Sequence, residues 1–172
     1  MSPFFQAALE GQFVEAHTKV VHLPSLLFIN FKFCHDYTTG GFEWAFRANK
    51  KYFPDQINIA RFDSLIRVWE AADYLLMHGL QDSLHVEIQT CLNRFSDIIK
   101  GPGGIAKKRK RYMRLARRCS DTASWLVGDL AIPSKPILCL LARFFYKNDN
   151  LTAGLKGFRK IIEAYPEFER EQ

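Results

Sequence analysis

The sequence contains no closely spaced pair of cysteines and no long apolar run. The four cysteines are scattered along the chain, as Cys34, Cys91, Cys119 and Cys139. Because zinc needs closely spaced ligands, we expect buried, reduced thiols rather than a metal site. The longest apolar stretch, 137–145, is interrupted by Arg143 and is much shorter than the about 20 residues that cross a bilayer. We therefore expect an intracellular protein without a membrane span, in the nucleus or the cytoplasm.

Sequence signatures of catalysis are also missing. The chain has no GxSxG, no HExxH, no glycine-rich loop between a strand and a helix, and no GKS or GKT phosphate clamp. The five histidines occur singly. His35 and Asp36 are adjacent, but on a helix they point about 100° apart, so we do not expect a charge-relay pair. We predict a protein that is not an enzyme and that carries no cofactor or metal.

What the sequence does contain is enough apolar material for a folded core. It has 172 residues, 48% of them hydrophobic, with 15 phenylalanines. Charge is uneven, since residues 1–100 carry 9 Lys+Arg against 11 Asp+Glu, whereas residues 101–172 carry 15 against 7. The change falls at "GPGG", residues 101–104, whose glycines and proline cannot continue a helix. We place a linker there, between regions 1–100 and 105–172.

The first 61 residues predict two helices, a strand and a loop. Ser2 is a candidate N-cap, followed by a short helix that stops at Gly11. The β-branched residues in Lys19–Leu23, with Pro24 behind them, favour a strand. An apolar stripe over 27–35 predicts a helix that ends at "TTGG". Residues 41–61 mix aromatic residues with Lys, Asn and Pro54, and we expect a loop with at most one edge strand.

Residues 62–95 show the clearest helical pattern. Apolar residues recur at helical spacing from Leu65 to Leu76 and again from Leu84 to Phe95. Asp63 is a candidate N-cap and Gly79 a candidate stop. Two helices joined by such a tight turn should pack as a hairpin.

The region after the linker also predicts helices. The first is a basic amphipathic helix over 106–119, and a second helix is capped by Asp121 or Thr122. Ser134 and Pro136 open a third helix, and Thr152 opens a fourth that closes before Pro166. Their apolar faces predict a small helical subdomain.

The ordered segments in residues 2–96 resemble the BTB/POZ domain, in particular the forms common in filamentous fungi. The likeness rests on "SPFFQAALEGQFVE", "VVHLP", "FINFKFCHDYTTG" and "VWEAADYLLMHGLQDSLHVEI", in that order. In the family a β-hairpin and a first helix precede the first of these segments, and this sequence has no counterpart of them. The family belongs to the α+β class. We therefore expect a mostly α chain, with a partial BTB/POZ-like helical core, a short residual strand or hairpin, and a helical extension over 105–172.

The resemblance implies a protein-protein interaction module, because BTB/POZ domains bind other proteins. A subset of the family docks onto a cullin scaffold as a substrate adaptor for ubiquitin ligation. In that subset a hydrophobic residue, any residue and then Glu follow the "FFxAA" helix, and Phe13, Val14 and Glu15 match this pattern. An exposed aromatic anchor beside a carboxylate suits an interface. We do not expect a homodimer, because the family's usual dimer contacts use the N-terminal strand and first helix.

The basic run "AKKRKRYMRLARRC" allows three interpretations. Its cations are candidates for nuclear import or polyanion contact, and they are Lys107, Lys108, Arg109, Lys110, Arg111, Arg114 and Arg118. The helix can pack its apolar strip on the following helices and leave the cations in water. It can act as a nuclear import signal through "KKRKR", or contact nucleic acid or an acidic membrane, although we find no base-reading motif. The alternative functions are thus a nuclear basic protein that uses residues 105–118, or a shortened gene product without independent function.

Overall fold

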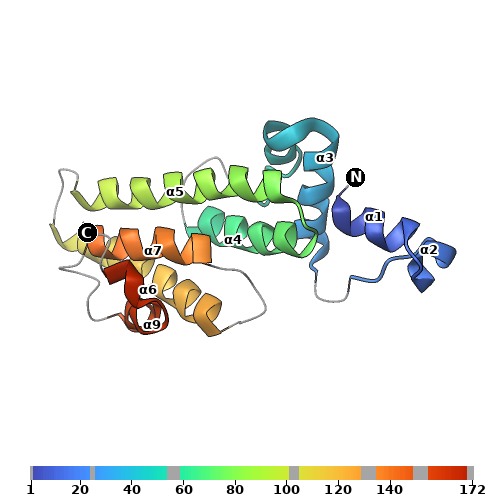
Figure 1. The fold of residues 1–172 in the computed structure, drawn as a ribbon. Coiled ribbons are helices and arrows are strands. Elements are labelled where there is room, and N and C mark those ends of the chain that lie inside the picture. Colours follow the sequence, from blue (N-terminus) through green and yellow to red (C-terminus); the bar gives the residue numbers. More distant parts are fainter. Residues whose placement is uncertain are drawn as a thin grey trace. The chain divides into compact units, whose positions relative to one another are not determined.

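The computed structural model describes residues 2–23, 26–53, 59–100, 105–128, 135–148 and 155–169, without the side chains of 99, 100, 105–112, 167 and 169. Every regular element in these ranges is a helix (Figure 1). The elements are α1 (Pro3–Glu10), α2 (Val14–Thr18), α3 (Phe28–Ala48), α4 (Ile59–Tyr74), α5 (His78–Lys100), α6 (Ile105–Gly128), α7 (Lys135–Lys147), α9 (Lys156–Ala164) and the 3₁₀ turn η1 (Pro166–Glu169). The predicted mostly α class is confirmed.

The chain divides into two compact units, Met1–Glu87 and Ile88–Gln172, so the division falls inside α5. The second half of α5 belongs with the helices that follow it, and buries Ile88, Cys91 and Phe95. A buried hydrogen bond in this unit joins Asn148 Nδ2, after α7, to Ser96 Oγ of α5 at 3.1 Å. The linker predicted at 101–104 lies outside the described residues.

The opening helix begins as the sequence indicates. Ser2 Oγ accepts a hydrogen bond from the Phe5 N–H, Pro3 occupies the first turn, and the helix ends before Gly11. The helix is fixed to its unit by aromatic contacts. The ring centres of Phe4 and Tyr74 of α4 are 5.3 Å apart, and those of Phe5 and Phe31 of α3 are 6.0 Å apart.

The strand predicted at Lys19–Leu23 is wrong. The preceding residues form the short helix α2, and residues 19–23 belong to neither a helix nor a strand. Lys19 adopts a left-handed conformation with φ 56°, and its N–H closes the helix by bonding to Glu15 O. An extended segment is stabilised by ladder hydrogen bonds to a neighbour, and none of the described residues supplies such a neighbour. The β-branched residues alone do not make a strand.

The loop predicted over 41–61 is also corrected, because α3 continues through Ala48. Gly41 has φ 77° and ψ −172°, a conformation that is open almost only to glycine, so the helix bends sharply there and resumes at once. The resumed part places Phe42 and Phe46 against Phe33, at ring distances of 6.2 and 5.2 Å. Phe53 packs on the same ring at 4.7 Å. This aromatic cluster packs the resumed part of the helix against its first part.

The two predicted helices are present as α4 and α5, but their ends differ from the prediction. Helix α4 already begins at Ile59, so Asp63 lies within it and is not its N-cap, and Gly79 lies within α5 rather than ending α4. Helix α4 is terminated by Leu76, whose backbone is left-handed with φ 54°. The Met77 N–H bonds to Ala72 O at 2.8 Å and the Leu76 N–H to Asp73 O at 2.9 Å, which is a Schellman motif without glycine.

In the second unit α6 is one continuous helix, so no new helix begins at Asp121 or Thr122. The apolar face of the predicted amphipathic helix continues beyond Asp121 and Thr122, and the helix continues with it. That face buries Leu115, Ala116, Cys119, Ala123 and Leu126. Helix α7 begins close to the predicted residues, and α9 ends before Pro166 as predicted. Helices α6 and α9 cross where Gly157 of α9 meets Ser120.

Candidate functional site

The residues of the cullin-like motif lie at the start of α2. Phe13 precedes the helix in an extended conformation, Val14 is its first residue, and Glu15 lies in its first turn. The side chains of Phe13 and Val14 are 63% and 72% exposed, and Glu15 is half-buried. Two adjacent apolar side chains therefore point into solvent beside a carboxylate.

Helix α1 holds α2 in this position. Lys19, at the end of α2, donates a hydrogen bond from Nζ to Leu9 O at 3.1 Å. At the bend between the two helices, a Cβ on Gly11 would lie 2.4 Å from the backbone oxygen of Ala7, so this position suits glycine alone. Neither α1 nor α2 contains a buried residue. Figure 1 shows α1 beside α3 and α2 farther from α3 than α1 is.

Further apolar side chains in the same part of the chain are exposed. They are Val20, Leu27 and Phe28, with exposed fractions of 52%, 54% and 77%. Together with Phe13 and Val14 we call them the N-terminal apolar residues. Single exposed apolar residues are normal on a protein surface, and these five lie close together in the sequence, between positions 13 and 28.

The predicted basic residues fall on α6. For Lys107, Lys108, Arg109, Lys110 and Arg111 the side chains lie outside the described residues, although the backbone there is helical. Arg114 and Arg118 are exposed, and so is Arg117 between them. The buried face of the helix lies opposite, so its described part has the amphipathic pattern predicted from the sequence.

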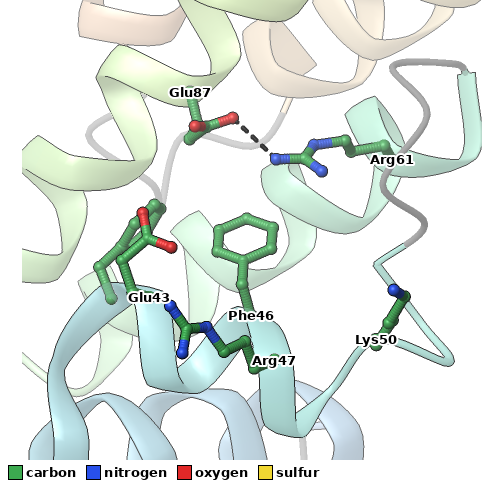
Figure 2. A pocket seen from close by; sticks show the side chains of 7 residues that line it. Glu43, Phe46, Arg47, Lys50, Arg61 and Glu87 are labelled. Atoms are coloured by element: carbon green, nitrogen blue, oxygen red, sulfur yellow. Dashed lines mark hydrogen bonds and ion pairs between the residues drawn. The ribbon is translucent and has the colours of Figure 1, made fainter.

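A pocket of about 330 Å³ lies between α3, α4 and the first half of α5 (Figure 2). Its inner side is formed by Phe46 and Arg61, whose guanidinium carbon lies 4.7 Å from the centre of the Phe46 ring. Arg61 Nη2 also pairs with Glu87 Oε2 at 3.0 Å. The side chains of Arg61 and Glu87 are 13% and 28% exposed, so the pair is partly shielded from water. It joins α4 to α5, and the contact of Arg61 with Phe46 adds α3.

The rim of the pocket comes from the second part of α3. Phe42 and Phe46 supply its apolar wall, and Arg47 and Lys50 add two exposed cations. Glu43 stands one turn before Arg47, and Figure 2 shows both beside the Phe46 ring. Neither Glu43 nor Arg47 has a side-chain hydrogen bond or ion pair with another residue in the described ranges.

A second polar cluster joins the two parts of α3. Asp36 Oδ2 accepts hydrogen bonds from Lys32 Nζ and, at 2.7 Å, from Asn49 Nδ2. Burial on its own would raise the pKa of Asp36, but these two donors and the charge of Lys32 hold that pKa below its usual range. His35 Nδ1 lies 3.6 Å from Asp36 Oδ1, closer than the helical spacing suggests. Asn49 is 1% exposed and its Oδ1 accepts no hydrogen bond from the described residues.

The cysteines do not form a metal site in the described part of the chain. Cys34, Cys91 and Cys119 are buried, Cys139 is half-buried, and none of the four forms a disulfide bond. Burial raises the pKa of Cys34 to about 12, so its thiol stays protonated at neutral pH. No group of three or more His, Cys, Asp or Glu side chains converges among the residues described.

Sequence reasoning missed the pocket. Phe42, Phe46 and Lys50 follow one another at intervals of four residues, and Arg47 follows Glu43 at the same interval. This spacing puts residues on one face of a helix, and it was available as a signal. Arg61 and Glu87 were not predictable in this role, because they come from two other helices.

Comparisons of the chain with protein-family models, with curated proteins and with solved structures find no match. Among the described helices, none combines the length and the apolar composition that crossing a bilayer demands.

Proposed function

We propose that the chain is a non-enzymatic protein-protein interaction module of the BTB/POZ type, and that Phe13 and Val14 are the centre of its contact surface. The observation that carries the proposal is the exposure of these two adjacent side chains at the start of a helix that buries no residue of its own. Covering them with a partner removes apolar surface from water, which favours association by about 25 cal/mol per Å² before the costs of binding.

The partner that we propose is the docking face of a cullin scaffold. Support comes from the resemblance of residues 2–96 to the BTB/POZ pattern and from the order of Phe13, Val14 and Glu15. An aromatic anchor that fills a partner's pocket supplies affinity, and a nearby carboxylate fixes the register. Glu15 is half-buried and lies in the first turn of α2, two residues after the anchor in the sequence.

The test is a titration of the chain against the purified N-terminal domain of a cullin by biolayer interferometry. We expect Phe13→Ala to weaken binding about thirtyfold, the effect of losing one interface hot spot. The matched control is Trp44→Ala, which removes an apolar side chain that is 53% exposed on α3 of the same unit. It should bind as the wild type does.

Each other outcome is decisive. Equal binding by Phe13→Ala and the wild type would show that the interface does not include the start of α2. Equal losses in Phe13→Ala and Trp44→Ala would show that the titration reports general surface hydrophobicity. A wild-type chain that does not bind at all would exclude the cullin scaffold as the partner.

A second candidate function rests on a different observation, the exposed arginines of α6. Arg114, Arg117 and Arg118 lie in water on one side of a helix whose other side is buried. A basic stripe of this kind attracts phosphates without reading a base sequence. Here the chain would be a basic protein that contacts nucleic acid through residues 105–118, with the first unit as its scaffold.

A further inference from the structure

The pocket between α3, α4 and α5 combines side chains that hold the fold together with others that have no such role. Arg61 pairs with Glu87 and lies over the Phe46 ring, so these three residues are structural. Arg47 is different, because it is exposed and its side chain forms no hydrogen bond or ion pair with a described residue although it lines the pocket. A cation beside an apolar wall is the arrangement that binds a carboxylate attached to an apolar group.

The charges around the pocket limit what it can bind. Arg47, Lys50 and Arg61 are positive, whereas Glu43 and Glu87 are negative, so the pocket carries a net charge of +1. A highly charged phosphate would be attracted by the cations but repelled by two carboxylates. A single carboxylate fits better, provided that the ligand also offers a hydrogen-bond donor to Glu43, which has no described partner of its own.

A peptide segment meets these conditions. An acidic side chain supplies the carboxylate, a neighbouring apolar side chain packs on Phe42 and Phe46, and the backbone N–H between them donates to Glu43. The volume of about 330 Å³ is at the small end for ligand pockets, so it suits one or two side chains rather than a nucleotide.

We propose that this pocket binds a peptide segment in which a Glu or Asp follows an aromatic residue. Arg47 holds the carboxylate in a bidentate pair, Lys50 adds charge, and the aromatic wall of α3 takes the apolar side chain. The proposal does not depend on the contact surface at Phe13, which lies in a different part of the same unit.

The test uses the full chain and isotope-edited NMR titration with the dipeptide N-acetyl-Phe-Glu-amide. We expect saturable shifts of the amide signals of residues 42–50. The uncharged analogue N-acetyl-Phe-Gln-amide and the variant Arg47→Gln should each weaken binding at least tenfold, as the loss of a charged hydrogen bond does. The controls are Arg67→Gln, an exposed arginine of α4 outside the pocket, and Phe13→Ala, both of which should bind as the wild type does.

Several results would overturn the proposal. These are the absence of saturable shifts, equal binding of the Glu and Gln peptides, or unchanged binding by Arg47→Gln. A third probe, 3-phenylpropanoate, presents the same carboxylate and ring without a peptide group. If it binds as tightly as the dipeptide, the pocket recognises a free aromatic acid and the assignment to a peptide is wrong.

Discussion

The backbone N–H of Gly157 in α9 donates a hydrogen bond of 2.8 Å to Ser120 Oγ in α6, and both residues are buried. A Cβ on Gly157 would lie 2.1 Å from the backbone oxygen of Ser120 and 2.6 Å from its Cα. These are backbone atoms, which cannot move aside as a flexible side chain does. The two helices of the second unit therefore approach so closely at this point that only glycine fits.

The first prediction concerns this crossing. We expect Gly157→Ala to destabilise the protein by about 3 kcal/mol, at the upper end of the usual cost of overpacking, because the helices must separate. Urea unfolding followed by circular dichroism measures the change. The control is Gly128→Ala at the end of α6, where a Cβ meets no atom within 4 Å. It should leave stability unchanged or raise it slightly, and an equal loss in both variants would contradict the tight crossing.

The turn between α4 and α5 yields the second prediction. Leu76 has a left-handed backbone, which costs residues other than glycine roughly 1–2 kcal/mol. Its side chain is 45% exposed, so Leu76→Ala and Leu76→Gly lose the same packing but differ in strain. We expect Leu76→Gly to be the more stable of the two by up to about 1 kcal/mol, after the entropic cost of glycine.

Leu75 supplies the matched comparison for that pair. It is fully buried and precedes the left-handed residue, so glycine there relieves no strain. Leu75→Gly should therefore be less stable than Leu75→Ala, which is the usual order of the two residues. The same order at positions 75 and 76, measured by thermal unfolding, would show that the turn is not strained at Leu76.

Local rules predicted the elements that depend on local contacts. The start of α1 was predictable because a serine side chain and a proline determine it within one turn. The exposed arginines of α6 and its buried side follow from the helical period alone, which is why that amphipathic pattern agrees with the sequence. In both cases the interaction that decides the structure lies within four residues.

Features that depend on distant partners were not predictable in this way. The segment Lys19–Leu23 has strand-like residues, but a strand also needs a neighbour at a distance in the sequence. Gly41 marks a bend within α3 and not its end. Beyond the bend, Phe42 and Phe46 pack on the Phe33 ring of the same helix, and this contact is not visible in the local sequence. The pocket was missed because Arg61 reaches Phe46 and Glu87 only after three helices have packed.

The third prediction concerns pH and the Asp36 cluster of α3. The donors Lys32 and Asn49 lower the pKa of Asp36 in the folded protein. At acidic pH the unfolded chain therefore binds a proton at Asp36 more strongly than the folded protein does. Its contribution to stability is therefore complete above about pH 5 and is lost as the pH falls through the folded pKa. We expect the wild type to lose more thermal stability between pH 6 and pH 3 than Asp36→Asn does.

The control for this prediction is Asp82→Asn, which changes an exposed carboxylate on α5 of the same unit. It should follow the wild-type pH dependence. If Asp36→Asn also follows the wild type, the cluster around Asp36 does not contribute to acid sensitivity. If Asp82→Asn flattens the curve as much as Asp36→Asn does, the effect comes from net charge and not from the bonds to Lys32 and Asn49.

The last prediction separates the two candidate functions through the salt dependence of binding to duplex DNA. If α6 contacts phosphates, each contact adds about 0.9 to the slope of log affinity against log salt concentration. Replacing Arg114 and Arg117 with Gln should then reduce that slope by about 2, as measured by fluorescence anisotropy with a labelled duplex. The matched double variant replaces Arg94 of α5 and Arg143 of α7 with Gln. Both arginines are also exposed, and their replacement removes the same charge. An equal fall in slope in both double variants would show attraction by net charge alone and would contradict a specific contact of α6 with phosphates.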